Sequence, residues 1–145
     1  MTPDEEPVDS ASDWVAEHTR RYVETDGAEG HLWRGVPTLV LTTRGRRSGR
    51  ARRNALIYGR DGDKYVVVAS KGGADMNPLW YMNLGADPEV RLQVGAEKLR
   101  ARARTASAEE KARLWPVMAG IWPAYDDYTA KTSREIPVVI LEPVA

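Results

Sequence analysis

The sequence of 145 residues predicts a single α+β domain built on an antiparallel sheet or a small barrel. Three observations favour this fold class. Short apolar and β-branched segments follow one another, separated by glycine-containing turns typical of hairpins. One amphipathic helical segment precedes them, and another is inserted late, before a final apolar strand. Strands that run mainly as hairpins, with helices at the flanks, indicate antiparallel pairing.

The N-terminal part is predicted to contain an acidic tail and one helix. Residues 1–9 hold proline and acids with little to bury, so we expect a mobile tail, and residues 10–145 form the folded domain. From Ser10 onward, larger side chains recur near helical spacing, and Gly27 marks the expected end of the helix. These side chains are Trp14, Val15, His18, Tyr22 and Val23.

The middle of the chain reads as strands. The run "PTLVLTT", residues 37–43, is rich in β-branched side chains and predicts the first strand. The segments "NALIYG" (54–59) and "KYVVVAS" (64–70) lie on either side of Asp61-Gly62, a dipeptide typical of hairpin turns. We therefore expect these two segments to pair with each other.

A short helix and two more strands follow. In "NPLWYMNLGADP" we expect Asn77 to cap the helix, Pro78 to occupy its first turn and Gly85 to lie near its end. The next segments, 89–95 and 97–105, alternate in polarity as strands with two different faces do. In the second of them one face carries Lys98, Arg100, Arg102 and Arg104.

The C-terminal part is predicted to be a helix and a central strand. Ser107 and Glu110 form a capping box, which opens a helix that Pro116 is expected to kink or divide. The closing run "IPVVILEPV", residues 136–144, is apolar on both faces, so we expect it to be central in the sheet.

The composition excludes several functional classes. Cysteine is absent, which excludes disulfides, thiolate metal sites and a cysteine nucleophile, and fits a reducing cytoplasm. There is no apolar run of about 20 residues for a membrane span, and the acidic N-terminus is not a secretory signal. The net charge of zero hides an asymmetry: residues 1–30 hold nine acids against two bases, and residues 31–71 hold ten bases against two acids. The basic part should attract an anionic partner.

Most of this positive charge lies in "RGRRSGRARRN", residues 44–54, which contains six arginines and no acid. Its glycines, Gly45 and Gly49, allow the backbone to turn and to approach a ligand closely. Arginine forks match phosphate and carboxylate oxygens two at a time. If the hairpin forms as expected, "SKGG" brings Lys71 back near this segment, and together they would grip an anionic tail. The alternative is a solvated basic loop.

The sequence lacks the familiar catalytic motifs, since it has no Walker loop, no GxGxxG, no GxSxG and no metal-type cluster of His and acids. An organic cofactor would therefore supply the chemistry of an enzyme with this sequence. The aromatic residues Trp122, Tyr125 and Tyr128 are three apart and would share one face of a helix. Packing is one interpretation of this stripe; the other is a pocket mouth at which tyrosine hydroxyls contact a flat ring.

Four motifs occur in a specific order: TT-x-G-R-x-S-G from Thr42, ASKGG from Ala69, NPxWYxNL from Asn77 and IPVVxLEP from Ile136. With these motifs the chain resembles the deazaflavin-dependent nitroreductase family, whose members are also described as quinone reductases that use coenzyme F420. The resemblance covers about residues 30–143. It implies a split β-barrel, like that of pyridoxamine-phosphate-oxidase and flavin-reductase proteins, in an antiparallel α+β fold with flanking helices.

The resemblance also implies an F420-dependent oxidoreductase that passes a hydride from the reduced deazaflavin to a quinone, enone or nitroaromatic acceptor. It places the cofactor phosphate and oligoglutamate tail on Arg46, Arg47, Ser48, Arg52, Arg53 and Asn54, and the ring system along Ala55, Leu56 and Ile57. The other two cofactor-contacting stretches would be Val68, Ala69, Ser70 and Lys71, and Leu79, Trp80, Tyr81, Met82 and Asn83. Ser70, Tyr125 and Tyr128 fall at substrate-facing positions. We expect a tyrosine to stabilise or protonate the developing oxyanion while Ser70 assists.

Two departures from the family pattern bear on activity. Ala55 stands where proline usually follows R-x-N. Trp122 replaces the first tyrosine of the aromatic stripe, so the resemblance does not by itself imply reduction of bulky nitroimidazoles. The alternatives that remain are an FMN-binding split-barrel oxidoreductase and a non-catalytic carrier of F420. A nucleic-acid module is the least favoured, because the N-terminal part is acidic.

The expected partner is thus a small-molecule electron acceptor, with no nucleic acid and no metal, in a monomer or weak homodimer. The expected location is the cytoplasm, with a peripheral position at the inner face of the cell membrane as the alternative. The acidic N-terminus does not support membrane association.

Overall fold

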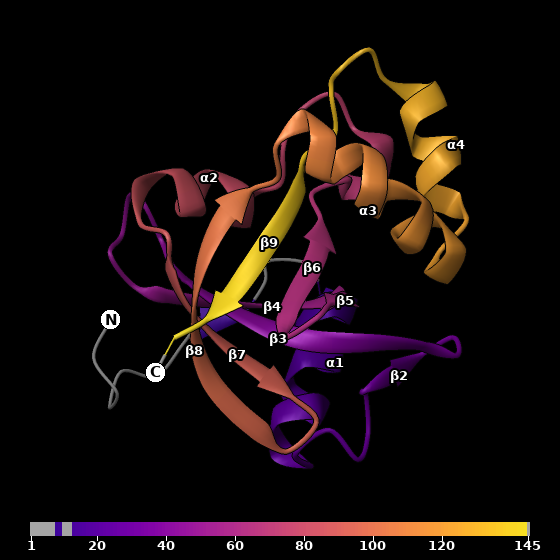
Figure 1. The fold of residues 1–145 in the computed structure, drawn as a ribbon. Helices are drawn as coiled ribbons and strands as arrows, with labels where there is room; N and C mark the ends of the chain where they lie inside the picture. The colour runs from indigo at the N-terminus through magenta and orange to yellow at the C-terminus, as the bar shows by residue number, and fades with distance from the viewer. Residues whose placement is uncertain (1–7, 10–12, 145) are drawn as a thin grey trace.

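The structure, a computed structural model, describes residues 8–9 and 13–144 (Figure 1). Its strands are β1 (Val8–Asp9), β2 (Leu32–Trp33), β3 (Val36–Arg44), β4 (Ala51–Ile57), β5 (Gly59–Asp61), β6 (Lys64–Val68), β7 (Glu89–Val94), β8 (Glu97–Thr105) and β9 (Val138–Pro143). Its helices are α1 (Asp13–Glu24), the 3-10 turn η1 (Lys71–Gly73), α2 (Leu79–Ala86), α3 (Ala108–Ile121) and α4 (Ala124–Lys131).

The strands form one curled sheet in the order β1-β4-β3-β7-β8-β9-β6-β5, with β2 paired to the side of β3. Every pairing is antiparallel except the one between the backbones of β1 and β4. The α+β, antiparallel prediction is therefore confirmed. The apolar strand β9 lies between β8 and β6 with Val138–Leu141 buried, as its sequence predicted.

The sheet curls until strands near its two ends approach each other. β4 and β6 are far apart in the strand order, yet they lie close in space. Tyr58, just after β4, and Tyr65 of β6 place their ring centroids 5.7 Å apart. We call the line along which β4 faces β6 the seam. The seam is where the barrel stays open, because β4 and β6 do not pair along it.

Two apolar clusters hold this shape. The first fills the inside of the curled sheet, with Trp80 of α2 closing one end; its members include Leu39, Leu41, Tyr65, Val67, Ala69, Leu92, Val139 and Leu141. The second lies between the outer face of β6–β9 and the helices α3 and α4; its members include Val66, Leu114, Met118, Tyr125 and Ile140. Successive residues of β6 enter different clusters, because neighbouring side chains of a strand point to opposite faces.

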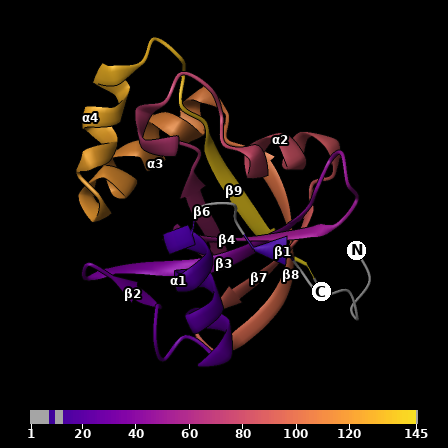
Figure 2. The same ribbon diagram turned by 180° about the vertical axis from the view of Figure 1, so that it is seen from behind.

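Helix α1 covers the outer face of β3 and β4 (Figure 2). Tyr22 of α1 is fully buried, and its hydroxyl donates a hydrogen bond to the Thr38 carbonyl at 2.9 Å and accepts one from the Gly95 amide at 2.6 Å. At the end of this helix Gly27 has φ +84°, and an added Cβ would lie 2.5 Å from the Gly95 Cα. Glycine is therefore required where this helix ends, as the sequence suggested.

Most elements match their predicted ranges, and the capping box of Ser107 and Glu110 is formed. The helix α3 continues through Pro116, so the prediction that this proline could divide it is wrong. The proline stands nine positions into the helix, where flanking packing of Leu114 and Met118 holds the backbone in place. The predicted tail, residues 1–9, lies outside the described residues except for the β1 backbone, as do residues 10–12 of the predicted first helix.

Two further expectations are corrected. The segment 54–59 does not pair with 64–70 along its length: β4 pairs with β3, and only the short β5 pairs with β6 around Asp61-Gly62. The predicted strand 54–59 is interrupted at Tyr58. Residues 54–57 belong to β4 and pair with β3, whereas Gly59 belongs to β5 and pairs with β6. Asn77 does not cap α2, because Pro78 occupies the N-cap position and the Asn77 side chain accepts a hydrogen bond from Arg134 instead.

Candidate functional site

The arginine-rich segment forms the connection between β3 and β4, and we call residues 45–50 the arginine turn. The Gly45 amide donates to the Arg50 carbonyl at 2.7 Å, and the Gly49 amide donates to the Gly45 carbonyl at 2.8 Å. Gly49 has φ +72°, and a Cβ on Gly45 would lie 2.8 Å from the Ser48 hydroxyl oxygen. The two glycines thus permit a compact turn, which the sequence indicated.

The cations of the arginine turn are open to solvent. Arg46, Arg47 and Arg50 are exposed, and none of the three forms an ion pair with any residue that the structure describes. By contrast, Arg44 at the base of the turn pairs with Asp87 at 3.3 Å. Exposed guanidinium groups that lie on one turn and form no ion pair with a described carboxylate are suited to a multivalent anion.

Helix α2 holds the arginine turn in place through Asn83. The Asn83 side-chain oxygen accepts a hydrogen bond from the Arg46 amide, and its nitrogen donates to the Thr43 hydroxyl, both at 3.1 Å. Asn83 is 7% exposed and Thr43 is fully buried. Both the oxygen and the nitrogen of the Asn83 side chain therefore form a hydrogen bond within the protein, and these two bonds fix the turn. The resemblance had placed Asn83 among residues that contact the cofactor.

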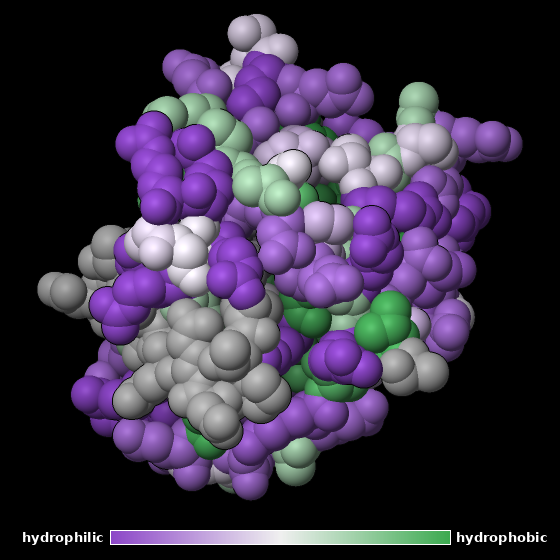
Figure 3. Space-filling model, turned by 90° about the vertical axis from the view of Figure 1, so that its left-hand side faces the viewer, coloured by the Kyte–Doolittle hydropathy of each residue, from purple (hydrophilic) through white to green (hydrophobic). Residues whose placement is uncertain are grey.

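The other predicted residues of α2 divide into two groups. Trp80 is buried in the first apolar cluster, and the Tyr81 hydroxyl lies 2.8 Å from the Thr105 hydroxyl. Leu79 and Met82 are exposed apolar side chains. The face of the molecule in Figure 3 is mainly hydrophilic, with scattered apolar side chains. Among the predicted α2 residues, Leu79 and Met82 are consequently the ones with exposed side chains.

The predicted residues of β4 are divided between the two faces of the sheet. Arg52, Asn54 and Leu56 alternate on the inner face, where Leu56 packs against the first apolar cluster. Arg53, Ala55 and Ile57 lie on the outer face, where Arg53 lines a hollow beside α1. A ligand on one face of β4 can therefore contact the side chains of only one of these sets, which the sequence did not reveal.

The segment after β6 has an unusual backbone. Val68 and Ala69 are buried, and Ser70 has right-handed helical angles (φ −79°, ψ −37°). Lys71 has φ +45°, a left-handed conformation that is uncommon for a residue other than glycine. A right-handed residue followed by a left-handed one is the backbone combination that forms anion-binding concavities in proteins.

The aromatic stripe does not form one helical face. Trp122 caps the end of α3, and Tyr125 and Tyr128 belong to α4. Tyr125 is only 4% exposed, and burial raises the pKa of its hydroxyl above its usual range. Tyr128 is half-buried, and its oxygen accepts a hydrogen bond from the Trp122 indole at 3.3 Å. Tyr128 is therefore more accessible to a substrate than Tyr125, whose packing role the sequence left open.

The structure brings Tyr128 and the Ser70 segment together. Gly73, which closes η1, lies so close to α4 that an added Cβ would be 3.0 Å from the Tyr128 carbonyl oxygen. Lys71 and the arginine turn follow different strands. Lys71 follows β6, whose partners are β5 and β9. The arginine turn follows β3 and is hydrogen-bonded to α2. The hairpin around Asp61-Gly62 is present only as the short pairing of β5 with β6, and it does not continue as a pairing of β4 with β6.

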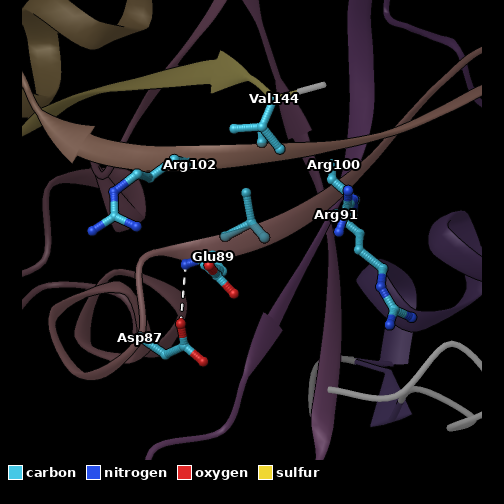
Figure 4. Close-up of a pocket in the computed structure, with 8 residues that line it drawn as sticks. Asp87, Glu89, Arg91, Arg100, Arg102 and Val144 are labelled. Atoms are coloured by element: carbon cyan, nitrogen blue, oxygen red, sulfur yellow. Dashed lines mark hydrogen bonds between the residues drawn. The ribbon is translucent and has the colours of Figure 1, made fainter.

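Two hollows lie on the outer face of the sheet. One, of about 420 Å³, is lined by Arg53, Arg91, Lys98 and Arg100 beside α1. The other, of about 500 Å³, has Arg91 and Arg100 at one end and Arg102 with Asp87 and Glu89 at the other (Figure 4). Arg53 is the sole predicted site residue that lines either of these two hollows, so they do not coincide with the predicted cofactor residues.

The described residues contain no cluster of three His, Asp or Glu side chains that could hold a metal ion. None of the helices formed by these residues combines the length and apolar character that crossing a membrane requires.

Comparison with known proteins gives the same relationship at three levels. The family model for F420H(2)-dependent quinone reductase matches residues 14–143. F420H(2)-dependent quinone reductase Rv1261c of Mycobacterium tuberculosis is 40% identical over 128 residues, which cover 86% of each chain. A solved structure described as an F420-H2 dependent reductase (FDR-A) is 39% identical with a TM-score of 0.68, over 73% of this chain and 94% of that one.

Another solved structure, described as a domain-swapped dimer, is 40% identical with a TM-score of 0.71 and covers 92% of this chain and all of its own. Among distant structures, the heme storage protein HutZ of Vibrio cholerae is 15% identical with a TM-score of 0.57, over 74% of this chain and 82% of its own. That likeness shows the fold alone and confirms the split-barrel prediction. The match over nearly the whole folded part shows that the chain belongs to the F420H(2)-dependent quinone reductase family.

Proposed function

We propose that this protein binds reduced coenzyme F420 and catalyses transfer of a hydride from it to a quinone. Family membership supports this proposal, and its relatives carry names that state F420H(2) dependence and quinone reduction. The observation in the structure that supports it best is the arginine turn, whose exposed cations have no ion-pair partners among the described residues and whose backbone is fixed by Asn83.

The donor set suits the cofactor's anionic end. Charge-assisted hydrogen bonds from guanidinium groups to phosphate or carboxylate contribute about 1.5–3 kcal/mol each when partly desolvated. We propose Arg46, Arg47 and Ser48 of the arginine turn, together with Arg52 on the inner face of β4, as the residues that hold the phosphate and glutamate tail. Arg53 lies on the opposite face, so we assign it a role in attracting the anion rather than in holding it.

The ring system is proposed to lie along the seam, between the inner face of β4 and the end of β6. Asn54 and Leu56 would border it on one side, with Ser70 and the backbone of Lys71 on the other. The bound cofactor supplies the hydride, which together with one proton reduces a quinone to a hydroquinone. The concavity at Ser70 and Lys71 would orient the ring through N–H donors, so that the reaction needs mainly proximity and alignment.

Tyr128 is proposed as the group beside the acceptor. Its hydroxyl accepts from Trp122, so its own proton is free to be donated to an oxygen that gains charge as the hydride arrives. Tyr125 supports Tyr128 through an edge-to-face ring contact at 6.1 Å. Burial raises the pKa of the Tyr125 hydroxyl above its usual range, which fits a packing role beside Tyr128.

The test is binding of reduced F420 to charge-reversed variants. Arg47→Glu and Arg52→Glu should each weaken binding at least tenfold, which corresponds to about 1.4 kcal/mol, and should flatten its dependence on salt. Arg102→Glu makes the same change of charge on the exposed outer face of β8 and is the matched control. Equal affinity for all four proteins would overturn the assignment of the anion site.

The electron acceptor is identified with the same purified protein and reduced F420. Oxidation of reduced F420 by menadione, compared with an enone and a nitroaromatic compound, tests whether quinones are the preferred class. Tight binding without oxidation would favour a carrier of F420, and a flavin spectrum in the purified protein would favour an FMN enzyme of the same fold.

We further propose that the protein is a monomer or weak homodimer in the cytoplasm. A similar protein of known structure is described as a domain-swapped dimer, which makes the dimer the form to look for. Sedimentation velocity over a range of concentrations tests the proposal, and a stable dimer at nanomolar concentration would contradict it. Flotation with anionic vesicles would show whether the protein also associates with membranes.

A further inference from the structure

Arg134, which no sequence motif singled out, makes four hydrogen bonds to one loop. It lies between α4 and β9, and the loop, residues 69–77, connects β6 to α2; we call it the Ser70 loop. Nη1 donates to the Ala69 carbonyl at 3.2 Å and to the Asn77 side-chain oxygen at 2.7 Å. Nη2 donates to the Ser70 carbonyl at 2.9 Å, and Nε donates to the Ala74 carbonyl at 3.0 Å. One side chain thus joins the beginning of the loop to its end.

The Ser70 loop needs such a tie because its backbone is strained. Lys71, Gly72 and Gly73 have φ values of +45°, +63° and +82° in succession. Lys71 is not a glycine, and a residue of this kind persists in the left-handed region only where the surroundings hold it there. The backbone bonds from Gly73 to Ser70 (2.9 Å) and from Ala74 to Lys71 (3.2 Å) are the local contacts that close the turn.

The same arginine also relates the loop to the end of α4. Its own amide donates to the Thr132 hydroxyl oxygen at 3.1 Å, and that hydroxyl donates to the Asp75 carboxylate in the Ser70 loop at 2.9 Å. On the other side of the loop, Gly73 touches the backbone of Tyr128. The segment that carries Arg134 therefore sets the distance between the Ser70 loop and the helix that carries Tyr128.

We infer that Arg134 is a positioning residue that holds the Ser70 loop in its ligand-binding conformation against α4. All four of its acceptors are uncharged oxygens, and within the described part of the chain no carboxylate forms an ion pair with it. Its role is therefore the geometry of a planar fork, which a lysine cannot reproduce with a single nitrogen. The expected effect of Arg134 on F420 affinity rests on the proposed function. Its expected effect on the conformation of the Ser70 loop does not.

The experiment compares Arg134→Lys and Arg134→Gln with the wild-type protein, and uses Arg113→Lys as control. Arg113, in the middle of α3, forms a two-pronged pair with Asp61 of β5, so its replacement also removes an arginine fork but leaves the loop intact. The first measurement is amide hydrogen exchange without cofactor. Both Arg134 variants should speed exchange at Gly73 and Ala74 at least tenfold, with Val139 and Ile140 of β9 unchanged.

The second measurement is affinity for reduced F420. Because misplacement by about 1 Å at a positioned site can lower rates or affinities by roughly a hundredfold, we expect both variants to bind F420 about 10–100 times more weakly. Thermal stability is recorded for every variant. Asn77→Ala removes only the 2.7 Å bond from Nη1 and should change exchange and affinity in the same direction by less; it carries the test if Arg134→Gln does not fold.

The outcomes separate the two proposals. Wild-type exchange at Gly73 and Ala74 in the Arg134 variants overturns the inference, as does uniform acceleration across β9, which would mean a general loss of stability. Full retention of affinity and exchange by Arg134→Lys also overturns it, because charge would then suffice. If the wild-type protein does not bind F420, the proposed function fails, and the exchange pattern alone decides whether Arg134 positions the loop.

Discussion

Replacing Asn83 by leucine tests whether α2 fixes the arginine turn. Leucine has a similar shape but neither donates nor accepts hydrogen bonds, so both 3.1 Å bonds of Asn83 are lost. The two partners differ in their surroundings. The Thr43 hydroxyl is fully buried and would stay without a partner, whereas Arg46 is exposed and its amide can bond to water.

The expected loss of stability follows from this difference. An orphaned buried hydroxyl costs about 1–3 kcal/mol, and loss of an exposed amide bond costs about 0.5–1.5 kcal/mol. We therefore expect Asn83→Leu to lower the free energy of unfolding by roughly 2–4 kcal/mol. Adding Thr43→Val removes the orphaned hydroxyl, and we expect the double variant to recover about 1–2 kcal/mol of this loss.

The assay is urea unfolding of the wild-type protein, the two single variants and the double variant, followed by tryptophan fluorescence. Unchanged m-values would show that the compactness of the two states is preserved. Affinity for reduced F420 is measured on the same four proteins. It should fall in both proteins that carry Asn83→Leu and stay low in the double variant, because the Arg46 amide remains untied.

The reasoning would be refuted if Asn83→Leu changed stability by less than about 0.5 kcal/mol, the range of an ordinary surface substitution. It would also be refuted if Thr43→Val made the Asn83→Leu protein less stable, since the coupling would then have the wrong sign. An unaltered affinity for F420 would show that the turn keeps its conformation without α2.

Three further predictions concern the tyrosines, the loop and pH. Tyr128→Phe should lower kcat for menadione with little effect on F420 affinity, whereas Tyr125→Phe should affect turnover less; equal effects in steady-state kinetics would contradict the assignment. Gly73→Ala forces a side chain at φ +82° to within 3.0 Å of the Tyr128 carbonyl and should cost about 1–3 kcal/mol in urea unfolding; a neutral effect would mean that α4 can shift. Arg104, and after it the Ser107 amide, lower the pKa of Glu110 from 4.5 to about 2. A lowered pKa stabilises the fold above about pH 4.5, and this contribution is lost as pH falls from there to about 2, so the difference in Tm between wild type and Glu110→Gln should be present at pH 7 and vanish near pH 2.

The elements of the fold could largely be predicted from the sequence, because each is encoded by a local pattern. Alternation of arginine and alanine in β8 sets which face is buried, and the structure confirms it with Ala101 and Ala103 inside. The Ser107–Glu110 capping box spans three residues and is found as predicted. The family motifs likewise identified the family and the split barrel.

The pairing of β4 could not be predicted in this way. The segment after Asn54 looked like one arm of a hairpin, and local pattern favours the nearest partner along the chain. In the structure β4 pairs with β3, because the arginine turn joins these strands directly and the curl of the sheet leaves β6 facing β4 across the seam. Both chain neighbours of β4 lie close enough in sequence to form a hairpin with it, and the packing of the whole sheet decides between them.

The sequence by itself thus determined the family, the elements and the basic turn that is proposed to hold an anion. The tertiary structure decided which residues can take part. In the folded protein Asn83 is hydrogen-bonded to the arginine turn, and Tyr125 is buried. The β4 residues are divided between the two faces of the sheet, and Arg134 lies against the Ser70 loop. The physical reason is distance along the chain: these polar ties join residues 37 to 65 positions apart. Such partners are chosen by folding in three dimensions and leave no local pattern to detect.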